Sequence, residues 1–388
     1  MNIEAYRSRR VFLRLAMAVA AAGLGAACSA APTAPTPATS SKPTEQRAPT
    51  APAATQPAQV AVATPAAKLA APASAMTLKW GSNPSAADGA VFIAQAKDYF
   101  AEQGITLELT QVALASQLLA PLGQNQLQVA GSAIGAGLFN AIGRGIAMPI
   151  VADRGNHNPG HGYQALVIRA LLANEIKEPA DLKGRTYSEP GPDGTGEVSL
   201  ATYLHNGGLT IKDVNFVALN FSDMQAALES GKIDAAGPVE PWVTRSVESG
   251  AARVLVRYDE VIPGHQAAVV LFSEAFAQQR DVAVRFMVAY LKGARFYNDG
   301  FVKNDAAKRA EAIDILAAAT KVDKALFDKM VMPGLHPDGK VNVDTLEGDQ
   351  KYFVAKGSQE KAIDLQTAVD MSFADEAVRI LGPTVDTS

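Results

Sequence analysis

The chain contains 388 residues, with 35 Lys and Arg against 39 Asp and Glu, so its formal net charge is −4 at pH 7. This balance argues against nucleic acid as a partner, because phosphate binding needs a basic face. Cys28 is the only cysteine, which excludes an intramolecular disulfide.

The N-terminus carries the pattern of an export signal. Residues 8–14 read S-R-R-V-F-L-R, which is typical of twin-arginine signals. An Ala-rich, uncharged segment follows, and it is shorter than the roughly 20 residues that a membrane-spanning helix needs. It ends in L-G-A-A-C (24–28), which resembles a bacterial lipobox, with Gly25 where that motif usually has a larger aliphatic residue. We predict a signal over 1–28 that is lipidated at Cys28; the alternative is an ordinary cleavage site beside a chance cysteine.

The next segment, 29–75, is rich in Pro, Ala and Thr and has no apolar periodicity. Such a composition predicts a disordered tether, because it cannot bury enough apolar surface to fold. The remaining chain is long enough for two lobes of ordinary size. We predict that 76–164 joins 266–388 in lobe 1 and that 165–265 forms lobe 2.

Strand and helix patterns alternate through both predicted lobes. Strands are expected over 77–81, 105–112, 127–130, 148–152, 164–168, 186–189, 214–219, 233–236, 252–256 and 267–272. Helices are expected between most of them and throughout the region after Ser273, where Val284, Met287, Val288 and Leu291 share one helix face. The Gly-, Asn- and Pro-rich stretch 153–163 is predicted to be an irregular hinge loop beside a ligand cleft.

Five polar loops follow predicted strands of this α/β pattern. In such sheets a ligand lies beyond the carboxyl ends of the strands, where helix N-termini present unpaired N–H groups. The sequence therefore predicts a binding cleft lined by loops 82–89, 131–137, 153–163, 190–197 and 237–242.

Several short phrases along the chain form a recognisable set. They are L-x-W-x-x-N (78–83) ahead of Gly89, D-Y-F-A-E-Q-G-I (98–105), G-S-A-I-G-A-G (131–137), D-L-K-G-R (181–185), A-A-L-E-S-G-K-I-D-A (226–235) and E-P-W (240–242). Together with the export signal they resemble the solute-binding lipoproteins of ABC importers. The resemblance is to the nitrate, sulfonate and taurine type and to its relatives that bind thiamine-precursor pyrimidines or riboflavin.

This resemblance implies an α/β fold, namely the two-lobed periplasmic-binding-protein fold (type II), with a hinge between the lobes. It implies a small-molecule solute as ligand, and an ABC permease with its ATPase subunit as partner. We expect an exported monomer, held by a lipid anchor at the outer face of the cell membrane, that uses no cofactor and binds no metal.

The residue types in the predicted cleft indicate which ligand it takes. The loops carry several carboxylates but only Arg154 as a permanent cation, and burying an anion beside unpaired carboxylates is costly. Carboxylates suit a ligand that donates hydrogen bonds, and aromatic side chains can stack on a planar ring. We predict riboflavin or a thiamine-precursor pyrimidine; nitrate, taurine or another sulfonate is the alternative. The predicted ligand-binding residues are Trp80, Asn83, Asp88, Ser132, Asn156, Tyr163, Asp193, Thr195, Glu197, Glu240 and Trp242.

For each of these residues the alternative is a structural role, as a core aromatic or as the acidic cap of a helix. Trp80 and Asn83 match the opening phrase of the pyrimidine-binding relatives, whereas Asp88 stands where those relatives often have histidine.

A metal site and an enzyme are the competing interpretations. His157 and His161 are four residues apart with Asp153 nearby, but Pro159 and Gly160 prevent a helix between them, so we predict no metal. Pyrimidine-synthase relatives share the implied fold, and the resemblance implies that they use a histidine and a cluster of cysteines. No cysteine follows Cys28, so we predict that the chain is not an enzyme.

Overall fold

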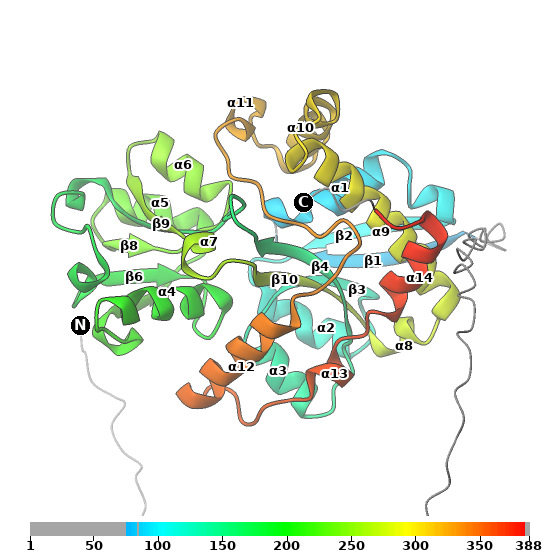
Figure 1. Ribbon diagram of the computed structural model, residues 1–388, viewed down its shortest axis with the longest axis horizontal. Coiled ribbons are helices and arrows are strands. Elements are labelled where there is room, and N and C mark those ends of the chain that lie inside the picture. The colour runs from blue at the N-terminus through cyan, green and yellow to red at the C-terminus, as the bar shows by residue number, and fades with distance from the viewer. Residues whose placement is uncertain (1–74, 84, 385–388) are drawn as a thin grey trace, which may run out of the picture. The chain divides into compact units, whose positions relative to one another are not determined.

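The computed structural model describes residues 75–83 and 85–384 (Figure 1). The predicted signal 1–28, the lipidation site Cys28 and nearly all of the predicted tether lie outside the described residues. The described strands form two five-stranded sheets, with the orders β2-β1-β3-β10-β4 and β7-β6-β8-β5-β9. The sequence-based prediction of a two-lobed α/β fold is confirmed, and we name the lobes by these sheets.

The lobe 1 sheet contains β1 (Met76–Ser82), β2 (Ile105–Gln111), β3 (Val129–Ala133), β4 (Ile150–His157) and β10 (His265–Phe272). Strand β1 is parallel to β2 and β3, whereas β10 lies between β3 and β4 and is antiparallel to both. The carboxyl ends of β1 and β3 therefore lie on the same edge of the sheet as the start of β10, which places the loops after β1 and β3 together.

The lobe 2 sheet contains β5 (Ala165–Arg169), β6 (Thr186–Glu189), β7 (Asn215–Ala218), β8 (Ala235–Ala236) and β9 (Ala252–Arg257). Strand β6 is parallel to β7 and β8, and β5 is antiparallel to β8 and β9. Helices α4 (Thr195–Asn206), α5 (Phe221–Glu229), α6 (Trp242–Glu248) and α7 (Tyr258–Val261) surround this sheet (Figure 1).

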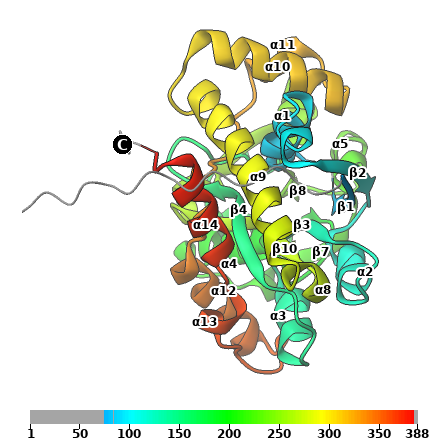
Figure 2. The same ribbon diagram turned by 90° about the vertical axis from the view of Figure 1, so that its right-hand side faces the viewer.

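Helices of lobe 1 come from both ends of the described chain. The early ones are α1 (Gly89–Ala96), α2 (Leu119–Gly123) and α3 (Ala136–Gly143). The late ones are α8 (Glu274–Ala277), α9 (Arg280–Phe301), α10 (Ala306–Thr320), α11 (Lys324–Phe327), α12 (Val343–Lys356), α13 (Leu365–Ala368) and α14 (Ser372–Leu381). Figure 2 shows α14 beside α9. No helix in the described ranges is long and apolar enough to cross a membrane.

Helix α9 organises the core of lobe 1. Its predicted apolar face is buried, with Val284, Met287, Val288 and Leu291 each at most 2% exposed. The helix packs this face against α1 and the sheet, so the 3.6-residue periodicity correctly identified the buried side.

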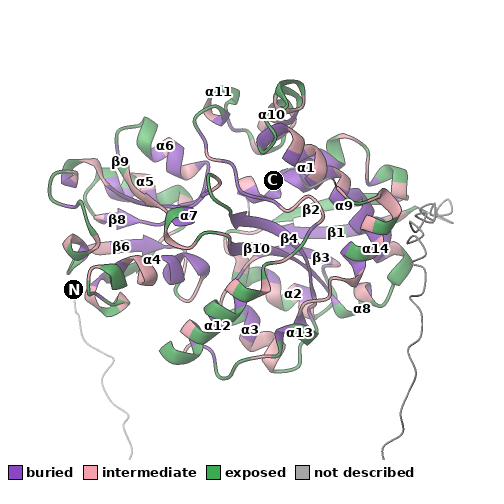
Figure 3. Cartoon of the chain, viewed as in Figure 1, coloured by how far each residue is buried: buried purple, intermediate pink, exposed green. Residues whose placement is uncertain are grey.

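The prediction of an irregular loop from residue 153 was wrong for 153–157. These residues continue β4, which pairs with β10 and is buried along its whole length (Figure 3). The polar side chains are tolerated because their partners are supplied by the fold. Asp153, for example, accepts hydrogen bonds from the N–H of Gly155, from Asn156 and Gln266, and from the N–H of His336. Buried polar groups with partners carry little cost.

Two chain segments cross between the lobes, one after β4 and one before β10. They are hydrogen-bonded to each other: the N–H of Gly264 donates to the His157 carbonyl at 2.7 Å, and the N–H of Tyr258 donates to the Gln164 carbonyl at 3.1 Å. The lobe boundaries given above from the sequence, and the closure of rigid lobes about these two segments, stay predictions.

Candidate functional site

A cavity of about 650 Å³, here called the cleft, is lined by both lobes. Lobe 1 contributes residues that follow β1, β2 and β3 together with Arg154 of β4, and lobe 2 contributes the end of β6, the following loop and parts of α4 and α5. The residues that line it include Asn83, Leu114, Leu119, Ser132, Ile134, Arg154, Tyr163, Gln164, Glu189, Asp193, Thr195, Phe221 and Val239. The cavity lies beyond the carboxyl ends of β1, β3 and β6, where parallel strands place a ligand.

The two lobes touch at one side of the cleft through backbone atoms. The N–H of Ala136 in α3 donates to the carbonyl of Asp193 at 2.9 Å, and Gly135 pairs with Gly194 in an isolated bridge. A Cβ atom on Gly135 would lie 2.8 Å from the Asp193 carbonyl oxygen, so only glycine permits this approach. The described conformation is therefore closed at this point.

The lobe 1 wall contains a buried ion pair between Arg154 and Asp88. Nη2 of Arg154 lies 2.9 Å from Oδ1 of Asp88, and the two side chains are 1% and 0% exposed. Nη2 also donates to the Asn83 carbonyl, and Ser82 donates to the other carboxylate oxygen. Burial raises the pKa of Asp88, while the neighbouring guanidinium lowers it. The positive charge of Arg154, the single arginine that lines the cleft, is thus balanced by the carboxylate of Asp88.

The lobe 2 wall contains the buried carboxyl group of Glu189, which has no counter-ion among residues 75–83 and 85–384. Its Oε1 accepts a hydrogen bond from the Tyr187 hydroxyl at 2.6 Å and a longer one from Gln164 at 3.4 Å. Its Oε2 has no hydrogen bond to the described part of the chain. Burial raises the pKa of Glu189 to about 8, although the Tyr187 hydrogen bond lowers it. Glu189 therefore carries a proton at neutral pH and can donate as well as accept a hydrogen bond.

Glycines make room for this carboxyl group. A Cβ atom on Gly196 would lie 1.9 Å from Oε1 of Glu189, and one on Gly237 would lie 2.5 Å from the same oxygen. Gln164 is fixed beside it by a 2.9 Å hydrogen bond to the Gly237 carbonyl. Glu189 and Gln164 thus form a rigid polar floor on the lobe 2 side.

The rim of the cleft holds a second set of charges, on the loop before α4, in the first turn of α4 and at the end of α12. Lys356, at the end of α12, forms ion pairs with Asp193 at 2.7 Å and with Glu197. The Tyr352 hydroxyl also donates to Glu197 at 2.8 Å. Since α12 belongs to lobe 1 and α4 to lobe 2, these contacts join the lobes, and the single ammonium group of Lys356 is shared by the two carboxylates.

Five of the predicted ligand-binding residues line the cleft: Asn83, Ser132, Tyr163, Asp193 and Thr195. Ser132 donates its hydroxyl to the neighbouring Ala133 carbonyl at 3.0 Å. Burial raises the pKa of Tyr163, so its hydroxyl stays neutral. Thr195 begins α4, whose N-cap Gly194 offers no side-chain cap, so the first N–H groups of the helix are available at the cleft.

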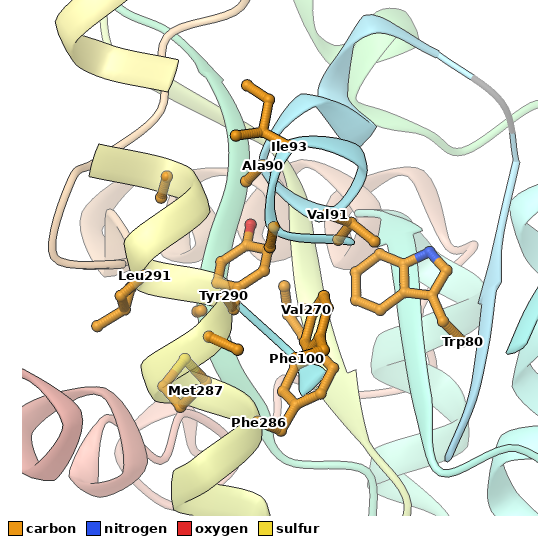
Figure 4. Close-up of a cluster of buried hydrophobic side chains, with 14 of the residues drawn as sticks. Trp80, Ala90, Val91, Ile93, Phe100, Val270, Phe286, Met287, Tyr290 and Leu291 are labelled. Carbon is orange, nitrogen blue, oxygen red and sulfur yellow. The ribbon is translucent and has the colours of Figure 1, made fainter. Parts of the chain in front are cut away.

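Trp80 is not among the lining residues, because it packs into the core of lobe 1. Its ring stacks with Phe286 at 6.2 Å and with Tyr290 at 6.5 Å (Figure 4), and it is 1% exposed. Strand alternation turns this side chain away from the cleft and toward α9.

The other predicted residues outside the cleft lining have partners within the protein. Asp88 pairs with Arg154, Asn156 donates to Asp153, and Glu197 is bound by Lys356 and Tyr352. Glu240 accepts from the N–H groups of Thr244 and Val331, and Trp242 packs against Phe221 at 5.8 Å. Within the protein, the carboxylates are thus engaged by hydrogen bonds or ion pairs, and the indole packs on Phe221.

Glu189, Gln164 and Phe221 are cleft residues that the sequence-based list missed. Glu189 ends a strand that the sequence predicted correctly, so the position itself was a usable signal, because ligands contact residues at the carboxyl ends of parallel strands. Gln164 and Phe221 carried no local signal, since each was placed within or beside an apolar segment.

The paired histidines considered for a metal do not converge. His161 contacts the Met332 carbonyl through Nδ1 at 3.1 Å, whereas His157 is buried against Tyr163 and Tyr258, and burial lowers its pKa. Within residues 75–83 and 85–384, no three His, Cys, Asp or Glu side chains are grouped as metal ligands would be.

Residues 87–299 match the family described as NMT1/THI5 like. The chain belongs to this family. The predicted resemblance is thereby confirmed at the family level. Among curated relatives, a Brucella abortus protein, whose name classes it as a candidate binding protein, is 28% identical over 210 residues. This match covers 50% of the chain and 62% of the relative, so the chain spans less than two thirds of the relative's length.

Solved structures support the two-lobed periplasmic-binding-protein fold. The alkanesulfonate-binding protein SsuA from Xanthomonas axonopodis pv. citri, bound to MOPS, superposes with a TM-score of 0.62 at 18% identity, over 78% of this chain and 99% of SsuA. The nitrate-binding protein NrtA from Synechocystis PCC 6803 gives 0.64 at 15%, over 82% and 91%. The desulfurization enzyme DSZB gives 0.55 at 16%, over 78% and 98%. At these identities the likeness establishes the fold alone.

Proposed function

We propose that this protein is the solute-binding component of an ABC importer and that its cleft captures an uncharged, planar, polar heterocycle, such as riboflavin or a thiamine-precursor pyrimidine. The observation that carries this proposal is that each charged side chain lining the cleft is either paired within the protein or held neutral by burial. Arg154 is paired with Asp88, Asp193 is paired with Lys356, and burial keeps Glu189 protonated. A charged ligand would leave one buried charge without a partner, which is costly.

Cleft size and lining support the same proposal. A volume of about 650 Å³ is in the range of sites for vitamin-sized ligands. Leu114, Leu119, Ile134, Phe221 and Val239 provide apolar surface for a ring system. The carboxyl group of Glu189, being protonated, can donate to a ring nitrogen and accept from an adjacent N–H group.

A sulfonate or nitrate is the second candidate ligand. Nη1 of Arg154 has no hydrogen-bond partner within the described ranges, and the N-termini of α3 and α4 both reach the cleft without a side-chain cap. These are the donors that an anion uses. The fold shared with the sulfonate-binding and nitrate-binding proteins above adds to this candidate, and the neutral cleft counts against it.

Catalysis is not part of the proposal. The described cleft contains no cysteine, since the only cysteine is Cys28. The family and the superposition with DSZB leave an enzyme as an alternative, which turnover of a pyrimidine precursor by the purified protein would establish.

The experiment that tests the ligand class is calorimetric titration of the purified protein with riboflavin, an aminopyrimidine, taurine and nitrate, after mass spectrometry of any compound that co-purifies. We expect one heterocycle to bind with a micromolar or lower Kd and the anions not to bind. Glu189→Ala should weaken this ligand by about 1–3 kcal/mol, the cost of a lost buried hydrogen bond. Glu229→Gln, at an exposed carboxyl on α5, is the control. Tight binding of taurine or nitrate would instead show that the ligand of the cleft is an anion.

The lipid anchor is a separate part of the proposal. It rests on the single cysteine, Cys28, at the end of an export signal. Cys28→Ala should release the protein from membrane fractions without changing its affinity for ligand. Continued membrane association of this variant would argue against lipidation.

A further inference from the structure

A second cavity, here called the outer pocket, lies next to the cleft. Its volume is about 230 Å³, and its principal lining residues are Phe92, Trp242, Arg245, Leu316, Phe327 and Met330. Trp242 lines the outer pocket, whereas Phe221, on which it packs at 5.8 Å, lines the cleft. This aromatic pair therefore lies between the two cavities, which share Ser85 in their linings.

Both lobes build the outer pocket. Trp242 and Arg245 belong to α6 of lobe 2, and the other principal residues belong to α1, α10 and the segment around α11 in lobe 1. Two contacts join the lobes beside it: Lys329 forms an ion pair with Glu248, and the N–H of Val331 donates to Glu240 at 3.3 Å. The pocket thus depends on the arrangement of the lobes that is described here.

The lining combines aromatic and sulfur-containing side chains with two cations. Arg245 and Lys321 both line the pocket, and no Asp or Glu does. Within the described part of the chain, neither cationic side chain forms an ion pair or a hydrogen bond, unlike Arg154 in the cleft. Arg245 is half-buried and lies one helical turn after Trp242, so its guanidinium and the indole border the same space.

We propose that the outer pocket is a second binding site, for a small aromatic carboxylate. A dry cavity of about 150 Å³ lined by Leu, Ile and Phe binds benzene, so a volume of about 230 Å³ holds a ring with one carboxylate. Phe92, Trp242, Phe327 and the methionine sulfur atoms suit the ring. The guanidinium of Arg245 suits the carboxylate, which it can bind through two hydrogen bonds.

This site has a consequence for the lobes. A molecule that contacts residues of both lobes favours the arrangement in which the contacts exist. An aromatic carboxylate in the outer pocket would therefore favour the closed form, whichever ligand the cleft takes.

Fluorine NMR of the full chain labelled with 5-fluorotryptophan tests the proposal with benzoate as the probe. The chain contains 2 tryptophans, and Trp242→Phe assigns their signals. Benzoate should shift the signal of Trp242 and leave that of Trp80, in the lobe 1 core, unchanged. Benzamide, which has the same ring without charge, should bind about tenfold more weakly, because it forms no charge-assisted hydrogen bond.

Two pairs of variants locate the site. Arg245→Gln should weaken benzoate about tenfold and leave benzamide unchanged, whereas Arg253→Gln, an exposed arginine of the same lobe, should change neither. Ala319→Phe should fill the outer pocket and abolish binding; Ala318→Phe, next to it on α10 and exposed but not lining the pocket, is its control. An unshifted Trp242 signal, equal affinity for benzoate and benzamide, or full binding by Ala319→Phe would each overturn the proposal.

Discussion

In the lobe 1 wall of the cleft, the charges of Arg154 and Asp88 cancel in an ion pair. In the lobe 2 wall, Glu189 has no counter-ion in the described part of the chain and is neutral because burial keeps it protonated. Both walls present little net charge to a ligand, but the causes differ: an ion pair in lobe 1 and a pKa raised by burial in lobe 2. The ion pair cancels its charges while both side chains are ionised; burial raises the pKa of Asp88, and the Arg154 guanidinium lowers it. The protonated acid loses its proton, and the wall its neutrality, as the pH rises through about 8.

The difference separates two roles that a buried ionisable group can have. The Arg154–Asp88 pair is satisfied inside the protein, with Ser82 and the Asn83 carbonyl completing its hydrogen bonds. Glu189 lines the cleft and keeps one oxygen that has no hydrogen-bond partner among the described residues, so a ligand can supply that hydrogen bond. Four substitutions test this contrast between the walls.

Asp88→Asn should have the largest effect. It leaves the Arg154 guanidinium buried without a counter-charge, and breaking a buried pair in this way costs about 3–5 kcal/mol of the free energy of unfolding. Chemical denaturation measures the loss. The double variant with Arg154→Met removes both charges and should recover most of it. A loss below about 1 kcal/mol would show that the pair is more hydrated than its burial indicates.

Glu189→Gln should change how stability depends on pH. In the folded state the pKa of Glu189 is about 8, above its ordinary value of 4.5, so the folded protein holds a proton that the unfolded chain releases between these values. The contribution of Glu189 to stability is therefore present below pH 4.5 and is lost as the pH rises toward 8. Above pH 8, Glu189→Gln should be more stable than the wild type by roughly 2–4 kcal/mol.

The measurement is denaturation across this pH range for both proteins. Burial also raises the pKa of Asp153 to about 6, but this residue is common to both, so the difference between them isolates Glu189. Parallel stability curves for the two proteins would show that Glu189 is ionised at neutral pH and that the lobe 2 wall is negatively charged.

Trp80→Phe should lower the free energy of unfolding by roughly 1–2 kcal/mol, because it trims a ring that stacks on Phe286 and Tyr290 in a tightly packed core. Ligand affinity should be unchanged, since Trp80 lies behind the lobe 1 wall. Denaturation and calorimetry on the same samples give both values. A variant that keeps its stability but loses affinity for the ligand would show that Trp80 contacts the ligand.

Glu197→Gln should have the smallest effect, about 1 kcal/mol of stability or less, because its partner Lys356 keeps Asp193 and remains partly hydrated. Affinity should fall only slightly, through weaker contact between the lobes, and equally for every ligand. Asp364→Asn, at the exposed N-cap of α13, is the control for stability. A selective loss for one ligand would identify Glu197 as a ligand contact.

Local sequence patterns determined much of this protein. The order of strands and helices, the buried face of α9 and the position of the loops at the cleft followed from periodicity and from Gly- and Pro-rich turns, because these signals depend on residues close in the chain. Strand β6 was predicted with its observed ends, 186–189, and so was the polar loop after it. The short phrases along the chain identified the family.

Tertiary structure alone decided which polar and aromatic residues line the cleft. Asp88 is paired with Arg154, which is 66 residues away, and Glu197 is paired with Lys356, which is 159 residues away, so neither carboxylate lines the cleft. Trp80 and Tyr163 are both aromatic residues near the cleft, but Trp80 packs against α9 in the lobe 1 core, whereas Tyr163 lines the cleft. The stretch 153–157 became a strand because Gln266 and His336 satisfied Asp153. Such pairings depend on distant parts of the chain meeting in space, and no local pattern records them.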